Sequence, residues 1–456
     1  MRHFAWRWLA ASSLLVAASV ANSETRPQYG GTLHIAMREA WSSLDPAEAM
    51  PADSVTRASV MALIFENLVT MDDHGRARAA LASSWQAFHE NRQWRFQLRP
   101  GVKFHDGTPL STEIVAASLR VSNPSWNVMA GTDSITIQQE SSDTEMPAEL
   151  ALAQNAIAIR RPDSMPSGSG PFRVVKWQSG KELSLAANDD YWGGRPFLDS
   201  VEIEMARSLH DQVLAFQSGK ADVVEVAPEQ AQRMAIDRQR LFSSLPVELL
   251  ALVFTRDAQS PEEKLLRQAL SLSIDRDSMG SVLLQGAAQP AGSVLPNWMT
   301  GYAFVFPSQS NLSMARRDHD QARANPTWTL GYDGSDSLEH LLAERVALNA
   351  RDAGLSLQPT AAAGADLRLI CISLASPAPW VALGHVAANA GLPAPQTGNP
   401  SVENLYAAEQ SLLAGEQIIP LFHLPVVYAI SPALRNWKLQ RDGSWNLADT
   451  WLENRP

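Results

Sequence analysis

Residues 94–110 read WRFQLRPGVKFHDGTPL, and this stretch decides how the surrounding chain folds. Apolar and polar residues alternate over its first five positions, which predicts a strand with one buried face. The Pro100-Gly101 pair ends that strand and opens a turn. Beyond the turn, Ser111 or Thr112 is placed to cap a helix that runs to Arg120. The stretch therefore predicts a strand, a turn and a helix in that order.

Helical and strand patterns alternate through the rest of the chain. Helices are expected over 209–217, 337–353 and 402–413, and strands over 221–226, 327–332, 355–358, 366–373 and 418–430. Residues 375–400 are rich in Ala, Pro and Gly and show no clear period. Strand, helix and strand in succession predict a mixed α/β protein with more than one lobe.

The composition excludes several classes of function. The chain has 456 residues, 45% of them hydrophobic and 19% charged, with a formal net charge of -11. This negative charge opposes binding to phosphate backbones, so nucleic acid is not expected as a partner. The single cysteine, Cys371, lies in an apolar run, where we expect it to be buried by packing. One cysteine forms neither an intramolecular disulfide nor a cysteine-based metal cluster.

The amino-terminal residues resemble an export signal. Arg2 and Arg7 precede an apolar run from Trp8 to Val20, and small residues follow at the expected cleavage position. We expect residues 1–21 to be a signal peptide and the mature protein to be periplasmic. The alternative is an uncleaved amphipathic anchor. The apolar run is short for a membrane-spanning helix, which needs about 20 residues.

No catalytic or metal-binding motif is present in the sequence. The ten histidines are scattered, and there is no His-Glu-x-x-His, phosphate loop or Gly-x-Ser-x-Gly elbow. His105 and Asp106 are adjacent in the expected turn and are interpreted as turn residues rather than a catalytic pair. We therefore expect a protein that is not an enzyme, with no catalytic residues, no metal site and no cofactor; a secreted hydrolase with an unrecognised site is the remote alternative.

Several blocks, taken in order, resemble the family 5 extracellular solute-binding proteins of ABC importers, whose members carry dipeptides, oligopeptides, nickel chelates or haem. Their joint order carries the resemblance, which extends across residues 29–302 and more weakly beyond. The blocks are Tyr29-Gly-Gly-Thr-Leu, Leu44-Asp-Pro, Phe65-Glu-Asn-Leu-Val, Leu81-Ala-Ser-Ser-Trp, the stretch 94–110, Ser169-Gly-Pro-Phe, Asn188-Asp-Asp-Tyr-Trp-Gly-Gly-Arg-Pro-Phe-Leu-Asp, Phe216-Gln-Ser-Gly-Lys-Ala-Asp and Arg267-Gln-Ala-Leu-Ser-Leu-Ser-Ile-Asp-Arg.

The resemblance implies an α/β fold of the periplasmic binding protein type, cluster C, with mixed sheets, flanking helices and a hinge. The implied lobes are 24–54 with 168–247 and 424–456 for lobe I, 55–167 for a shortened lobe II, and 248–423 for lobe III. The two crossings between lobes I and III would lie near 249–256 and 421–428. Such a protein is a monomer that closes on a small or peptide-like solute and delivers it to membrane permease subunits of an ABC transporter.

Seven residues are candidates for contact with the solute. Trp41, Trp298 and Trp380 stand among Pro, Ser or Gly residues, where an aromatic face could line a cleft; packing between lobes is the alternative. The family resemblance implies that the loop after the first strand touches the ligand, which makes Arg38 and Glu39 candidates against a reading as solvated surface charge. His423 and Tyr428 fall in the returning hinge strand, with ordinary core packing as their alternative.

One segment departs from the family pattern. Peptide-binding members carry an aspartate after the strand that corresponds to 366–373, and it pairs with the peptide's amino terminus, whereas here residues 374–385 contain no carboxylate. An enclosed ammonium without a counter-charge is costly, so the sequence favours solutes without one, such as blocked peptides, sugars or apolar compounds. The missing carboxylate and short second lobe also leave open a degenerate binding-protein fold that acts as a scaffold without transport.

Overall fold

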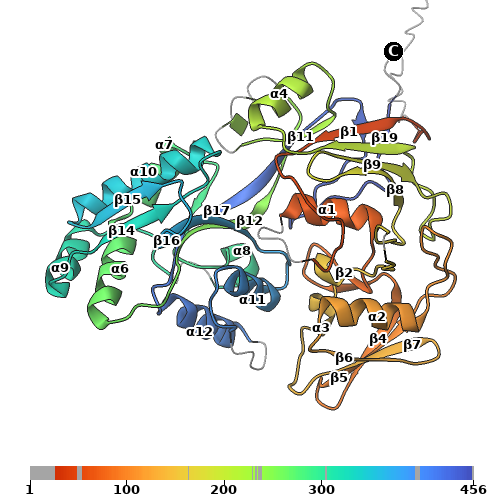
Figure 1. Ribbon diagram of the computed structural model, residues 1–456, viewed down its shortest axis with the longest axis horizontal. Helices are drawn as coiled ribbons and strands as arrows, with labels where there is room; N and C mark the ends of the chain where they lie inside the picture. Colours follow the sequence, from red (N-terminus) through yellow and green to blue (C-terminus); the bar gives the residue numbers. More distant parts are fainter. Residues whose placement is uncertain are drawn as a thin grey trace, which may run out of the picture.

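The computed structural model describes residues 26–48, 54–162, 164–227, 230–231, 234, 239–302, 306–395 and 401–453. The expected signal peptide, 1–21, lies outside the described residues. Two bodies stand side by side, joined by the long strands β12 (Leu241–Phe254) and β17 (Ile418–Ile430) (Figure 1). A smaller sheet extends the right-hand body downward.

A single mixed sheet of 11 strands runs through both bodies. From one edge its order is β15 (Ser356–Thr360), β14 (Thr327–Gly331), β16 (Leu367–Ser373), β12, β17, β11 (Val223–Glu225), β1 (Thr32–Ala36), β10 (Ser200–Glu204), β9 (Glu182–Ala187) and β8 (Phe172–Gln178). The short β13 (Gln289–Pro290) pairs with β17. Strands β12 and β17 are antiparallel and lie at the centre, so they belong to both bodies.

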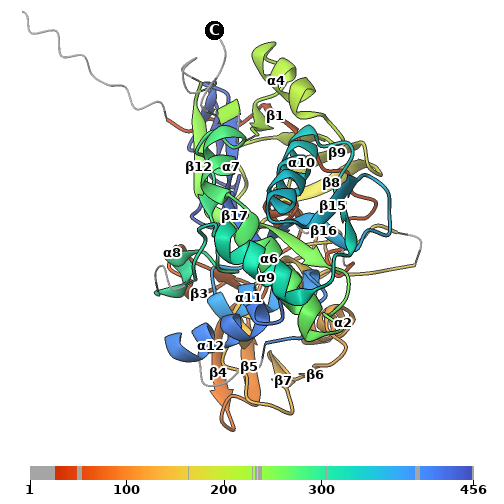
Figure 2. The same cartoon turned by 90° about the vertical axis from the view of Figure 1, so that its left-hand side faces the viewer.

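Residues 249–254, the second half of β12, are apolar on both faces, because helices cover both faces of the sheet in the left-hand body. Leu250 and Leu252 pack with α6 (Pro261–Ser273), α9 (Leu312–Ala322) and α10 (Ser337–Asp352), which Figure 2 shows together on the side facing the viewer. Leu249 and Ala251 pack instead with α11 (Pro379–Asn389) and α12 (Val402–Leu413). Successive side chains of a strand point to opposite faces, so burial on both sides requires an unbroken apolar run.

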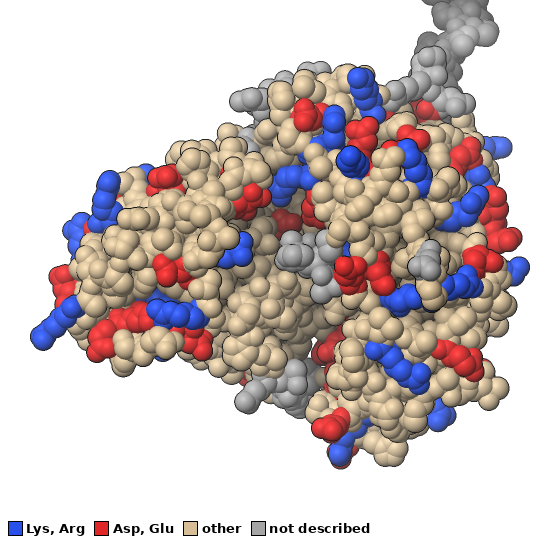
Figure 3. Space-filling view, in the orientation of Figure 1, with Lys and Arg blue, Asp and Glu red and all other residues tan. Residues whose placement is uncertain are grey.

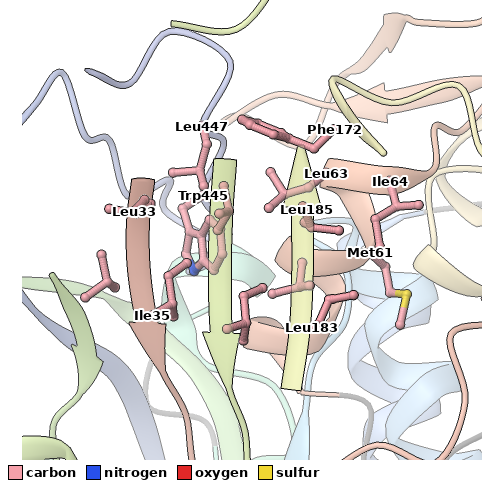
Figure 4. Packing of buried hydrophobic residues seen from close by; sticks show 14 of the residues in the cluster. Leu33, Ile35, Met61, Leu63, Ile64, Phe172, Leu183, Leu185, Trp445 and Leu447 are labelled. Atoms are coloured by element: carbon pink, nitrogen blue, oxygen red, sulfur yellow. The ribbon is translucent and has the colours of Figure 1, made fainter. Parts of the chain in front are cut away.

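The core of the right-hand body lies between the sheet and α1 (Val55–Ile64). Figure 4 shows Leu33 and Ile35 of β1 and Leu183 and Leu185 of β9 with residues of α1, closed on one side by Trp445. A carboxy-terminal segment thus completes a core that the amino-terminal strand begins.

The four-stranded second sheet has the order β4 (Ala82–Phe88), β5 (Gln93–Leu98), β7 (Ser134–Gln138) and β6 (Asn127–Ala130), with α2 (Thr112–Ser122) packed on it. The strand, turn and helix expected around residues 94–110 are confirmed. Ser111 is the residue that caps α2, and its side chain accepts a hydrogen bond from the backbone N–H of Ile114.

The remaining elements are short or peripheral. They are β2 (Val69–Met71), β3 (Ala77–Ala79), α3 (Met146–Glu149), η1 (Ala153–Asn155), α4 (Leu209–Gln217), α7 (Arg276–Val282), α8 (Asn297–Thr300), β18 (Leu434–Arg435) and β19 (Trp451–Leu452). Within the described part of the chain, no helix combines the length and apolarity that crossing a bilayer requires.

The pairing of β12 with β17 is irregular where the two bodies meet. The register shifts between Ser243 and Pro246 and again between Pro246 and Glu248, and Pro246 stands opposite Pro425. Proline has no backbone N–H to donate, so the ladder is weakened at this crossing.

Two expectations from the sequence are wrong. Residues 379–389, which showed no helical period, form α11. This helix buries Trp380, Val381, Ala382, Leu383, Val386 and Ala387, so its apolar residues surround it rather than form one stripe. Cys371, expected to be buried, is exposed. It pairs with Leu250 where β16 reaches the gap between the bodies.

Candidate functional site

Two adjoining cavities lie between the bodies. We call the first the acidic cavity; its volume is about 150 Å³, and residues after β1, from β11 and β12, from α10 and from β17 line it. The second cavity, of about 230 Å³, lies between α1 and the segment 373–377. Ser54 lines both cavities. Figure 3 shows the hollow between the two bodies, with acidic side chains along it.

The acidic cavity has a strong imbalance of charge. Its described lining residues carry five carboxylates and a single guanidinium, that of Arg38. The carboxylates come from the loop after β1, from the end of β11, from β12 and from the start of α10: Glu39, Glu225, Glu248, Asp336 and Glu339. The remaining walls are largely aliphatic and include Leu250, Leu284, Leu338, Leu342 and Leu424.

Arg38 is already paired across the cavity. Its Nη1 lies 2.7 Å from Oδ2 of Asp336, the residue that caps α10 on the other body. Its backbone N–H donates to Oε2 of Glu225 at 2.8 Å. Burial would lower the pKa of Arg38, but the carboxylates of Glu225 and Asp336 raise it above its usual value. Arg38 therefore stays charged and is occupied by groups of the protein.

Hydrogen bonds hold the wall formed by the right-hand body. The Nε1 of Trp41 donates to Oε2 of Glu39 at 2.9 Å, and Thr56 Oγ1 donates to Oε1 of Glu225 at 2.9 Å. The hydroxyls of Thr56 and Tyr428 are 2.8 Å apart. Burial, and next the charge of Glu225, raise the pKa of Glu39. These contacts fix the carboxylates before any solute arrives.

Glu248 lines the cavity, and no charged group among the described residues forms an ion pair with it. Among the described residues, its recorded hydrogen-bond donor is Sγ of Cys371, at 3.6 Å. Burial raises the pKa of Glu248 to about 7; the attraction of Arg38 opposes this shift, and the charges of Glu39 and Glu225 add to it. Cys371 is exposed to this cavity, and partial desolvation there, together with the charge of Glu248, raises the pKa of its thiol.

The second cavity is nearly neutral. Asp442 and His385 are the titratable groups among its described lining residues, and much of its wall is apolar, including Met61, Phe65 and Met71. Trp298 lines this cavity, and its Nε1 donates to the carbonyl oxygen of Pro246 at 2.7 Å. A solute that filled both cavities would meet acidic walls at one end and uncharged walls at the other.

The structure brings some of the expected residues together and separates others. Arg38, Glu39 and Tyr428 line the acidic cavity, and Trp41, 2% exposed, lies behind Glu39. Trp380 is 8% exposed in the core around α11 and lines neither cavity.

His423 also lines neither cavity. It is buried, and its Nε2 lies 3.1 Å from the carbonyl oxygen of Val294. Burial lowers its pKa to about 4, so its ring is neutral at pH 7. For Trp380 and His423 the geometry corresponds to packing rather than to contact with a solute.

Sequence reasoning missed most of the acidic wall. Glu225, Glu248, Asp336 and Glu339 were not among the expected site residues, and neither was Cys371. One signal was present for Glu248, because it is a lone carboxylate within the apolar run 245–254. The others end a strand or begin a helix, where acidic residues are common for structural reasons.

The carboxylates do not converge on one point. Within the described residues, no group of three or more His, Cys, Asp or Glu side chains is arranged to hold a metal ion. The acidic residues instead surround the cavity from several elements.

Several solved structures share this fold, and two of them were determined with a bound ligand. The oligopeptide-binding protein AppA of Bacillus subtilis, solved with a nonapeptide, superposes with a TM-score of 0.81 at 17% identity, covering 94% of this chain and 100% of that one. NikA of Staphylococcus aureus, solved with Ni(L-His)2, gives 0.79 at 18%, covering 92% and 100%. The fold is that of the periplasmic binding proteins.

The sequence itself gives the family. Residues 76–368 match the model of the bacterial extracellular solute-binding proteins, family 5, middle region, and the chain belongs to this family. The probable D,D-dipeptide-binding periplasmic protein DdpA of Escherichia coli is 25% identical over an alignment of 317 residues that covers 63% of this chain and 60% of that protein. The nickel-binding protein NikA of Staphylococcus aureus is 26% identical over 249 residues, 50% and 49% of the two chains. The sequence alignments thus span about half to three-fifths of these relatives.

Proposed function

We propose that the protein is the solute-binding component of an ABC importer. In this proposal it works outside the cytoplasm as a monomer, captures a small solute between its two bodies and presents the closed form to a membrane permease. The observation that carries the proposal is the pair of cavities enclosed between two bodies of one sheet. Enclosure between hinged bodies is the usual way in which such a fold sequesters a ligand.

The proposed closing motion pivots at the irregular crossing of β12 and β17. Pro246 and Pro425 face each other there, and the register shifts on both sides of Pro246. Few backbone hydrogen bonds have to change when the strands twist at such a point. The three lobe ranges expected from the sequence remain part of this proposal.

The test measures both capture and closure. Native mass spectrometry of the purified full chain should detect a bound small molecule, and small-angle scattering should show a more compact particle when that molecule is returned to the stripped protein. Its return should also raise the melting temperature by mass action. If no solute is retained and no member of a broad solute library compacts or stabilises the protein, the proposal fails and the scaffold alternative takes its place.

A further inference from the structure

We infer that the acidic cavity takes an organic cation, so that the solute carries an ammonium, guanidinium or amidine group. This inference rests on the proposed function and names the class of solute for the same cleft. The sequence favoured solutes without an ammonium group, because residues 374–385 contain no carboxylate. The inference reverses that preference, since four other segments supply the carboxylates of the cavity.

The first step is the balance of charge. Glu39, Glu225, Glu248, Asp336 and Glu339 face one cavity, and Arg38, the sole cation among the described lining residues, is held by Asp336 at 2.7 Å. An anionic solute would enter against this field, whereas a cation would be drawn to it. Like charges gathered in a partly dehydrated space repel one another, and a bound cation would relieve that repulsion.

The second step is the carboxylate of Glu248, which accepts a hydrogen bond from the weak donor Cys371. Glu225 and Glu39 accept hydrogen bonds from Thr56 and Trp41, so their oxygens are partly occupied. Glu248 faces the cavity, and from the described residues its recorded donor is the weak one of Cys371. A carboxylate enclosed without a strong donor is costly to retain, and a donor supplied by the solute removes that cost.

The third step concerns the size and the walls of the cavity. A volume of about 150 Å³ matches the cavity that accommodates a benzene ring, so it admits a small organic head group. Leucine side chains cover the faces between the carboxylates, which suits the alkyl carbons next to an ammonium or guanidinium. The carboxylates are not arranged as a metal site in the part of the chain described. These features favour an organic cation over a metal ion.

The test compares probes that differ in charge but little in shape. Pentylguanidinium, its neutral isostere pentylurea, and hexanoate are titrated into the stripped full chain by calorimetry and thermal shift. Pentylguanidinium should bind and stabilise the protein at concentrations where pentylurea and hexanoate do neither. The solute released from the purified protein should also carry a positive charge.

Two variants complete the test. Glu248→Gln keeps the size of the side chain, and we expect it to weaken pentylguanidinium binding by about tenfold or more while raising the melting temperature of the empty protein. Glu140→Gln, an exposed site outside the cavity, should change neither. If Glu248 had only a structural role, Glu248→Gln would lower the melting temperature instead.

The outcomes separate this inference from the function on which it rests. Equal binding of pentylurea and pentylguanidinium, or retention of a neutral or anionic solute that Glu248→Gln binds as tightly, would overturn the inference while the solute-binding function stands. If no solute is retained and none compacts the protein, the proposed function falls and the inference falls with it.

Discussion

Arg38 and Asp336 form an ion pair across the gap between the two bodies, with 2.7 Å between Nη1 and Oδ2. Arg38 follows the first strand of one body, and Asp336 caps α10 on the other, so under the proposed closing motion this contact ties together surfaces that would separate on opening. Both side chains are reached by water, at 58% and 19% exposure, and such a pair contributes about 1 kcal/mol or less. A contribution of that size is still enough to shift an equilibrium between open and closed forms about fivefold.

Replacing Asp336 by Asn should open the empty protein without unfolding α10. Asn caps a helix about as well as Asp, so the hydrogen bonds that Asp336 accepts from Leu338 and Glu339 have a substitute while the ionic attraction is lost. Small-angle scattering should report a larger radius of gyration at low salt. The matched variant Asp336→Ala loses the cap as well and should cost about 1 kcal/mol of stability. An unchanged radius for both variants would show that the pair does not hold the bodies together.

Glu248 should make the empty protein less stable as the pH rises. Its pKa is raised to about 7 in the folded protein from 4.5, so between these values the folded state binds more protons than the unfolded state, and the free energy of unfolding falls with increasing pH. Removing the charge with Glu248→Gln should raise the free energy of unfolding by on the order of 1 kcal/mol at pH 8, with no gain at pH 4. The titratable and charged groups that line the cavity with Glu248 are Arg38, Glu39, Glu225, Asp336, Glu339 and Cys371. Urea melts at both pH values measure the difference, and an equal gain at pH 4 would point to packing instead.

Cys371 should report whether the cleft is occupied. It is the single cysteine of the chain, it lines the acidic cavity, and the Glu248 carboxylate 3.6 Å away helps to raise the pKa of its thiol. Alkylation requires the thiolate, so the wild type should react slowly at pH 7.5 and Glu248→Gln several-fold faster. A bound solute should slow the reaction in both proteins. Intact-mass measurement of iodoacetamide labelling gives the rates, and identical rates in the two proteins would show that Glu248 does not control the thiol.

Glu263 should protect the protein against acid. It contacts Arg267, which is fully buried over the ring of Phe254, through Oε1 at 2.7 Å, and Arg256 as well. Burial alone would raise the pKa of Glu263, but hydrogen bonds from the Gln259 backbone and the two arginines lower it to about 2. The stability from this group is therefore complete above pH 4.5 and is lost as the pH falls toward 2.

The variant Glu263→Gln leaves the Arg267 charge buried without its counter-charge and should lower the free energy of unfolding by about 3 kcal/mol at pH 7. Glu262→Gln, at an exposed position next to it, is the matched control and should change stability little. Equal stability of the two variants at pH 7 would contradict this role.

Two tryptophans should respond in opposite ways. Trp380 is buried in the core around α11, so Trp380→Ala should lower the free energy of unfolding by about 3–5 kcal/mol while the folded fraction binds solute as before. Trp298 lines the second cavity, so Trp298→Ala should weaken solute binding by more than about 1 kcal/mol with a smaller loss of stability. Denaturant melts and calorimetry with the retained solute separate the two effects. If fully folded Trp380→Ala bound the solute more weakly than the wild type, Trp380 would be assigned to the wall of the cleft instead of the core.

Elements with a clear period could be predicted from the sequence, and α4, α12 and β17 occupy the ranges expected for them. The helix α11 could not, because a helix buried on most sides has no polar face to mark its period. The exposure of Cys371 could not be predicted either, because it arises from the cavity between the bodies, which no local pattern of apolar residues marks.

The candidate site was only partly predictable. The loop after β1 was found through the family resemblance, but Glu225, Glu248 and Asp336 are separated along the chain by as much as a quarter of its length and meet only through the order of strands in the sheet. Local sequence gives the polarity of each residue, whereas the sign of the field in the cavity depends on which of them face one another.

Because one sheet runs through both bodies, its central strands β12 and β17 resist rotation of one body against the other. Domains joined by a flexible linker reorient independently. Two bodies that share a sheet can change their relative orientation only by twisting the shared strands. Under the proposed function, a permease that bound one body and rotated the other would therefore set the width of the cleft directly. Release of the solute would then require the permease to twist these strands, rather than to compete with the binding protein for the solute.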